Sequence, residues 1–321
     1  MPGQKTVAII GAGPAGLTAA RMLLTKGYKV DIYDKEKFDG GVMAFGIPDF
    51  RIPESMVQKQ AEPAHKLGAN FIYGKPLKES DFLKLAEEYD YVYLAFGLTK
   101  VRHLNIRGEE MPECLNALEY LREYNFAHKL NLTAKLPHVH GKVIVVGAGN
   151  VAMDGSRVAV RTGADEVTVV YRRDRKNAPC KPSEMADAEK DGVKMCFLTN
   201  PVEINGKEGH IVSVKCEKMT LGPVDASGRQ SPVGTGEYVT LPCDYVIAAI
   251  GQIPDHEIWN VGKIKTNHDY IVGVEKDGEC YRTSVDNIYA GGDIVLGAKT
   301  IGAAVMCGMA FAKHVIALDS K

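Results

Sequence analysis

The chain has 321 residues and an ordinary globular composition, with 45% hydrophobic and 25% charged residues. That length favours two domains over one. Lys and Arg (39) nearly balance Asp and Glu (40), and the resulting net charge of −1 argues against a nucleic acid or a membrane as partner. The sequence shows no export signal and no apolar run of membrane-spanning length. Its seven scattered cysteines lack a Cys-x-x-Cys pair, so we expect a cytoplasmic protein with reduced thiols and no metal site.

One pattern of strand, glycine turn and helix occurs twice. Residues 7–16 match residues 143–152, at an offset of 136 positions. The first copy predicts a strand over 7–10, a helix over 14–26 and a strand over 29–34. The second predicts a strand over 143–146, a helix ending near 162 and a strand over 167–171. Short apolar runs of this kind are typical of strands buried on both faces of a parallel sheet, so we expect two Rossmann-like α/β units.

The remaining segments indicate how the two units are connected. Residues 91–97 and 245–251 are matched apolar strands ending in glycine, and residues 287–293 form a strand ending at Asp293. Residues 196–246 read as an antiparallel meander with turns at Asn205-Gly206 and Ser227-Gly228, and residues 300–318 as a closing apolar helix. We therefore expect one domain made of residues 1–105 and 255–321, with a second, residues 106–254, inserted into it.

The first glycine turn has the complete pattern of a dinucleotide site. Gly11 permits a tight turn, Gly13 lets a pyrophosphate approach the helix N-terminus, and Gly16 allows close packing of helix and strand. Asp34, at the end of the next strand, can accept a hydrogen bond from a ribose hydroxyl. Neighbours that we also expect to contact the ligand are Pro14, Ala15 and Lys35.

The second glycine turn differs where a different ligand would require it. Ala152 replaces the third glycine, a permitted variant. The next strand ends in a basic run with Arg172 and Arg173 and no carboxylate, and guanidinium groups match a 2′-phosphate. The second nucleotide is therefore predicted to be NADPH, with contacts expected at Gly149, Asn150, Val151, Ala152, Arg172, Arg173 and Gly251.

Asp293 is a further candidate, because ligands of open α/β sheets collect at the carboxyl ends of the strands. Its carboxylate could bond the ribityl chain of a flavin whose pyrophosphate lies on the first turn. The helix that begins near Thr300 would direct its positive end toward the flavin ring. The flavin contacts expected in this part of the chain are Gly97, Gly292, Asp293, Thr300 and Ile301.

These residues resemble the small subunit of NADPH-dependent glutamate synthase and the related modules of dihydropyrimidine dehydrogenase and ferredoxin–NADP transhydrogenases. The resemblance covers essentially the whole chain, and residues 40–51 are its most specific part. It implies an NADPH domain inserted into an FAD domain, with hydride exchange between the two cofactors. By match to the motif, it also implies flavin contacts at Gly41, Val42, Gly46, Ile47, Pro48 and Arg51.

Members of that family usually carry an N-terminal cysteine-rich domain with iron–sulfur clusters, whereas this sequence begins at the first strand. We therefore expect electrons to pass from the flavin to a separate iron–sulfur protein or a larger synthase subunit; a homo-oligomer is left open. Hydride transfer between two cofactors depends on their positions rather than on a proton donor, so we expect no catalytic side chain.

Three other functions are compatible with parts of this pattern. A thioredoxin-reductase-like enzyme needs a Cys-x-x-Cys pair shortly before the second glycine turn, but residues 114–147 contain a single cysteine, Cys114. A ferredoxin–NADP reductase and a catalytically silent flavin- or NADP-binding subunit both remain open at this point.

Overall fold

The computed structural model describes residues 4–132, 138–225, 228–273, 275–277 and 280–320. The chain divides into two compact units: unit 1 comprises residues 1–44, 52–100 and 252–321, and unit 2 comprises residues 45–51 and 101–251. Each is built on a sheet of parallel strands, so the predicted α/β fold class is confirmed. The chain passes from unit 1 to unit 2 between residues 100 and 101 and returns between residues 251 and 252. Residues 45–51, expected with the first domain, belong instead to unit 2.

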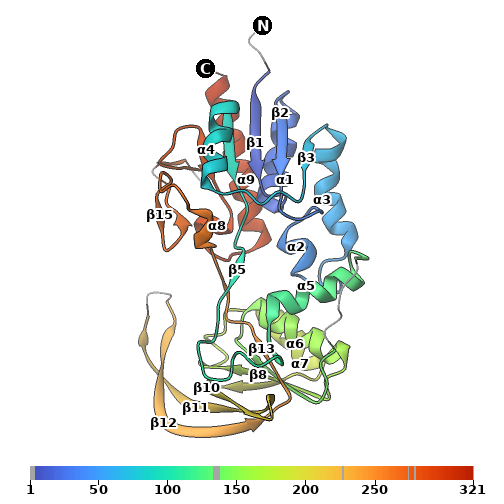
Figure 1. Cartoon of the computed structure of the whole chain (residues 1–321), viewed down its shortest axis with the longest axis vertical. Coiled ribbons are helices and arrows are strands. Elements are labelled where there is room, and N and C mark those ends of the chain that lie inside the picture. The colour runs from blue at the N-terminus through green and yellow to red at the C-terminus, as the bar shows by residue number, and fades with distance from the viewer. Residues whose placement is uncertain (1–3, 133–137, 226–227, 274, 278–279, 321) are drawn as a thin grey trace. The chain divides into compact units, whose positions relative to one another are not determined.

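The sheet of unit 1 joins strands from both ends of the chain (Figure 1). Its order is β17-β18-β19-β4-β1-β2-β3, in which β19, β4, β1, β2 and β3 are parallel and β18 and β17 add antiparallel pairs. The strands are β1 (Thr6–Ile10), β2 (Lys29–Tyr33), β3 (Asn70–Ile72), β4 (Tyr91–Leu94), β17 (Glu275–Asp277), β18 (Cys280–Arg282) and β19 (Ile288–Ala290). The C-terminal part of the chain thus completes the sheet begun by the N-terminal part.

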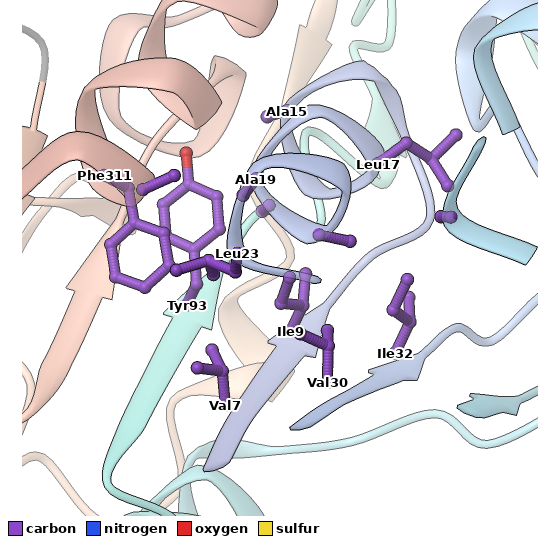
Figure 2. Close-up of a cluster of buried hydrophobic side chains, with 14 of the residues drawn as sticks. Val7, Ile9, Ala15, Leu17, Ala19, Leu23, Val30, Ile32, Tyr93 and Phe311 are labelled. Carbon is purple, nitrogen blue, oxygen red and sulfur yellow. The ribbon is translucent and has the colours of Figure 1, made fainter. Parts of the chain in front are cut away.

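Helices cover both faces of this sheet. One face carries α1 (Pro14–Leu24), α3 (Glu54–Lys66) and α9 (Ile301–Asp319), and the other carries α4 (Glu79–Glu88) and α8 (Asp293–Leu296). Figure 2 shows the first of these cores, where the rings of Tyr93 and Phe311 stack with centroids 4.2 Å apart. The smaller elements are α2 (Val42–Phe45), η1 (His256–Ile258), β15 (Thr266–Asn267), β16 (Tyr270–Ile271), and the paired strands β5 (Lys100–Val101) and β14 (Gln252–Ile253).

Unit 2 places its parallel sheet between helices and a second, antiparallel sheet. The parallel order is β6-β13-β7-β8-β9, with β6 (Cys114–Asn116), β7 (Lys142–Val146), β8 (Glu166–Tyr171), β9 (Lys194–Phe197) and β13 (Tyr245–Ala248). One face carries α5 (Ala117–His128), α6 (Asn150–Thr162) and α7 (Pro182–Lys190), and the other carries β10 (Thr199–Lys207), β11 (His210–Val224) and β12 (Gln230–Pro242).

The antiparallel sheet corresponds to the predicted meander, but one predicted turn is wrong. Strand β10 continues through Asn205 and Gly206 to Lys207. The turn is made by Glu208 and Gly209, which have φ values of 54° and 84°, as the tight turns of hairpins require. Ser227, in the second predicted turn, lies outside the described residues.

The returning part of unit 1 is fixed by one buried carboxylate. Glu79 is fully buried and accepts hydrogen bonds from four consecutive backbone N–H groups, those of residues 261–264, each at 2.7 Å. Although burial opposes ionisation, these bonds lower the pKa of Glu79. The segment that leads to β19 and Asp293 is therefore held by an ionised side chain at the start of α4.

Helix α9 approaches α1 so closely that glycine is required. An ideal Cβ at Gly308 would lie 2.2 Å from the carbonyl oxygen of Ala15. By length and composition α9 could also cross a membrane, which the sequence reading did not anticipate. However, Cys307, Phe311 and Val315 are fully buried against the core of unit 1.

We expect Gly308→Ala to lower the free energy of unfolding by about 1–3 kcal/mol, because the added methyl group meets backbone atoms. Gly302→Ala is the matched control on the same helix. Its nearest neighbour would be Thr300 Oγ1 at 3.8 Å, so this change should be neutral or stabilise by up to about 1 kcal/mol. Denaturant unfolding checks both, and equal stability of the two variants would contradict the packing described here.

Candidate functional site

The first glycine turn follows β1 and can be formed only by glycine at two positions. Gly11 has a φ of +112°, and an ideal Cβ there would lie 2.5 Å from the carbonyl oxygen of Ala95. At Gly16 an ideal Cβ would lie 2.0 Å from the carbonyl oxygen of Gly11. At Gly13, by contrast, φ is −84° and an ideal Cβ meets no described atom within 4 Å. The turn thus leaves open space in front of α1, whose N-terminus has no side-chain cap.

Asp34 is fixed beside this turn at the end of β2. Its Oδ2 accepts a hydrogen bond from the N–H of Ala12 at 2.7 Å, and its Oδ1 accepts one from Glu36 at 2.8 Å. Burial raises the pKa of Asp34, although these two bonds oppose the shift. Each carboxylate oxygen has a further lone pair, so Asp34 can still accept a bond from a ligand hydroxyl. Lys35 follows it and is exposed.

Further predicted contacts lie at the same carboxyl edge of the sheet of unit 1. The N–H of Gly40 donates to the carbonyl of Ala12 at 2.8 Å, and an ideal Cβ at Gly41 would lie 3.2 Å from the Cα of Gly13. At Gly292 an ideal Cβ would lie 3.5 Å from the Cβ of Ala15. The structure therefore brings these residues together around the first glycine turn.

Asp293 and Thr300 begin the two helices that close unit 1. Asp293 is the first residue of α8; it accepts a 3.2 Å bond from the N–H of Lys299, and burial raises its pKa. The hydroxyl of Thr300 caps α9 by accepting a 3.2 Å bond from the N–H of Ala303. Asp293 therefore lies just after β19 at the edge of the sheet, at the position expected from the sequence. The hydroxyl of Thr300 already accepts the N-cap hydrogen bond of α9.

The second turn, after β7, repeats the geometry of the first. Gly147 has a φ of +122°, and an ideal Cβ there would lie 2.4 Å from the carbonyl oxygen of Ala249. Gly149 has a φ of −82° with open space around it, and α6 also lacks a side-chain cap. Val151 and Ala152 lie in the first turn of α6, and Ala152 is fully buried.

A segment that the sequence reading missed also lies against this second turn. Before α7 the chain folds back, so that the N–H of Cys180 donates to the carbonyl of Ala148 at 3.1 Å. The next N–H, that of Lys181, donates to Oδ1 of Asn150 at 3.1 Å. No local pattern signals these contacts, because they join residues about thirty positions apart. Lys181 is exposed and adds a cation near the turn.

The structure separates the two arginines of the predicted phosphate site. Arg172 is exposed. Arg173 is only 4% exposed; it donates from Nη2 to Asp225 at 2.5 Å and from Nε to the carbonyl of Gln230 at 2.6 Å. Arg173 thus holds the ends of β11 and β12 together, whereas Arg172 is available to a ligand.

The residue that corresponds to Asp34 in unit 2 is Tyr171. The N–H of Gly11 bonds to the carbonyl of Tyr33, and that of Gly147 bonds to the carbonyl of Val170. The next residue along the chain is therefore an aspartate in unit 1 and Tyr171 in unit 2. Gly251, which follows β13, has a φ of +106° and accepts a 3.0 Å bond from the N–H of Arg102.

The predicted flavin contacts at Gly46, Ile47, Pro48 and Arg51 lie within unit 2. Arg51 donates to Asp154 on α6 at 2.5 Å and to Glu184 on α7 at 2.7 Å. The carbonyl of Ile47 accepts a 3.0 Å bond from the ammonium group of Lys129. The sequence reading grouped this stretch with the glycines that precede it and could not reveal these partners, which lie about 80 to 130 residues away.

Comparison with known proteins agrees with this architecture. Residues 5–308 match the family described as pyridine nucleotide-disulphide oxidoreductase. The chain is 39% identical to the beta subunit of the NADP(+)-dependent formate dehydrogenase of Moorella thermoacetica, over 95% of this chain and 42% of that protein. It is 34% identical to a putative glutamate synthase [NADPH] small chain of Cereibacter sphaeroides, over 98% of this chain and 76% of that protein.

Among solved structures, the fold is similar to that of Mycobacterium tuberculosis FprA in complex with NADPH. The TM-score is 0.81 at 22% identity, over 99% of this chain and 85% of that one. The chain spans about half the length of several curated relatives that it matches. The resemblance to glutamate synthase small chains and related NADPH oxidoreductases is confirmed, and the chain belongs to the pyridine nucleotide-disulphide oxidoreductase family.

Proposed function

We propose that unit 1 binds FAD, that unit 2 binds NADPH, and that the chain passes hydride from NADPH to FAD and electrons onward to a partner protein. One observation carries this assignment. The two glycine turns have similar geometry, but the strand beside the first ends at Tyr33 and is followed by Asp34, whereas the strand beside the second ends at Tyr171 and is followed by Arg172. The family and its NADPH-dependent members support the same pair of cofactors.

The residues present fit two dinucleotides. At both Gly13 and Gly149 an added side chain would enter open space rather than protein, so each turn leaves room for a pyrophosphate. The first N–H groups of α1 and α6 are not capped by side chains and can donate to its oxygens. When bound, FAD and NADPH supply the hydride chemistry, and the chain contributes binding, orientation and exclusion of water.

The ends of the second strands account for the choice between the two nucleotides. A carboxylate at Asp34 accepts from a free ribose hydroxyl and would repel a 2′-phosphate. In unit 2 the uncharged Tyr171 removes that repulsion, and the exposed Arg172 offers a guanidinium group that can pair with phosphate oxygens. Unit 2 is therefore better suited to NADPH than to NADH.

The names of the relatives support a partner for the flavin's electrons. Matches include proteins named as beta subunits and small chains, so this chain is proposed to work beside an electron-accepting protein, an iron–sulfur protein or a larger synthase subunit. A cytoplasmic location stays a prediction. A ferredoxin–NADP reductase would carry out the same hydride transfer but exchange electrons with a ferredoxin. A silent binding subunit would bind NADPH without reducing the flavin, which the next experiment distinguishes.

A paired substitution tests the assignment of the two units. FAD-loaded protein should be yellow and should bleach with NADPH under anaerobic conditions. Gly13→Val should lose FAD but still bind NADP+, whereas Gly149→Val should stay yellow and bleach at least about a hundredfold more slowly. Both changes place a side chain in the space left for a pyrophosphate, and at both positions an added Cβ meets no described atom within 4 Å, so both variants should fold.

Absorbance spectra and stopped-flow reduction provide the measurements. Colourless protein that takes up no FAD would contradict the proposal, and NADPH binding without bleaching would favour the silent subunit. Exchanged behaviour of the two variants would reverse the assignment of cofactors to units.

The arginine pair gives a second prediction. Arg172→Ala should raise the KM for NADPH by about ten- to a hundredfold and leave that for NADH nearly unchanged, because it removes a charge-assisted bond. Arg173→Ala should instead lower the free energy of unfolding by about 1–3 kcal/mol, since it leaves Asp225 without this partner. Steady-state kinetics and denaturant unfolding check both; equal effects of Arg172→Ala on the two nucleotides would rule out its role.

A further inference from the structure

Residues 45–51 are bound to unit 2 by side chains of α5, α6 and α7. The carbonyl of Phe45 accepts a 2.9 Å bond from the buried amide of Asn125. The guanidinium groups of Arg157 and Arg161 lie over the ring of Phe50, at 4.6 and 4.3 Å from its centroid. Arg51 completes the set through its two ion pairs. Residues 45–51 are therefore held to unit 2 at several positions by side chains.

Asp154 is the central acceptor of this network. Its side chain is 1% exposed; Oδ2 accepts from Arg51, and Oδ1 has no hydrogen-bond partner in the described part of the chain. Burial raises the pKa of Asp154 to about 7, although Arg51 opposes the shift. The other charges that act on it are Glu184 on α7 and Arg157 on its own helix. An isolated carboxylate in this position would be costly to ionise, so its charge depends on Arg51.

The peptide that ends in this network begins at the first glycine turn. Gly40 donates to Ala12, and Gly41 approaches Gly13. Only residues 42–44 separate Gly41 from Phe45, the first residue held by unit 2. At the other end, Asp154 lies one helical turn beyond Asn150, the first residue of α6. One continuous stretch of twelve residues therefore runs from contacts at the first turn to Asp154, on the helix that follows the second turn.

We propose that Asp154 is a positioning residue: by holding Arg51 it fixes residues 45–51 on α6 and α7, and so couples occupancy of the nucleotide turn in unit 2 to retention of the ligand at the first glycine turn. This inference rests on the function proposed above. A nucleotide that orders the start of α6 also stabilises the bond between Asp154 and Arg51. Residues 42–51 then hold Gly40 and Gly41 against the first turn. Because such coupling is reciprocal, each ligand tightens the other.

The test is the release of FAD from the holoprotein. Loaded protein is diluted with and without saturating NADP+, which accepts no electrons from oxidised flavin, and free FAD is followed by its fluorescence. In the wild-type chain NADP+ should slow release by about fivefold or more at pH 8.5. The effect should be smaller at pH 6, where protonation of Asp154 weakens the bond to Arg51. The measured quantity is the ratio of the FAD release rate without NADP+ to the rate with it. In Asp154→Asn this ratio should lie within about twofold of one at both pH values.

Two further variants make the result specific. Glu189→Gln removes another carboxylate of α7, one that pairs with Arg175 at an exposed site, and it should keep the wild-type ratio. Arg51→Lys retains the charge but not the two-pronged bond to Asp154 and Glu184, and it should reduce the ratio. If Asp154→Asn does not fold, Arg51→Lys decides the question. Hydrogen exchange of the amides of residues 45–51 should be faster in both variants that lose the bond.

A wild-type ratio of one, or an unchanged ratio in Asp154→Asn or in Arg51→Lys, would overturn the inference. Protein that binds both nucleotides and reduces its flavin normally, yet shows no such ratio, contradicts only this coupling. Protein that binds neither FAD nor NADP+ contradicts the proposed function itself.

Discussion

The close approach of each glycine turn to the end of a neighbouring strand determines the geometry of both candidate sites. Gly11 lies against the carbonyl of Ala95, and Gly147 lies against that of Ala249, at distances that exclude any side chain. Both glycines also have φ values that other residues rarely adopt. This contact bends the chain so that the next helix starts at the carboxyl edge of the sheet. Without it the N–H groups of α1 and α6 would not face the position of a ligand.

The two turns have closely similar geometry, and the main difference between the candidate sites lies at the end of the next strand. Asp34 is held by the backbone of the turn itself, whereas Tyr171 bonds to the carbonyl of Asn177 within its own loop. The two arginines that follow Tyr171 have different surroundings. Arg173 closes the end of a long hairpin, and Arg172 remains exposed. On the proposed function, a single repeated unit acquires two ligand preferences through a few side chains, while the parallel strands that carry them stay alike.

Most elements formed by residues close in the sequence could be predicted, whereas the side-chain contacts between distant residues could not. The strands, the glycine turns and the position of Asp293 follow from short apolar runs and from the internal repeat, so they were predicted closely. The burial of Arg173 depends on Asp225, and the buried state of Glu79 depends on residues 261–264. The attachment of residues 45–51 to unit 2 depends on Asp154. None of these partners is signalled by the local pattern around its counterpart.

A structure of the chain with both FAD and NADP+ bound would test the central claim most directly. The account predicts one pyrophosphate within hydrogen-bond distance of the first N–H groups of α1, with an adjoining ribose on Asp34. It predicts the second at the start of α6, with the 2′-phosphate near Arg172. A pyrophosphate found away from either helix start, or both nucleotides sharing one turn, would contradict it.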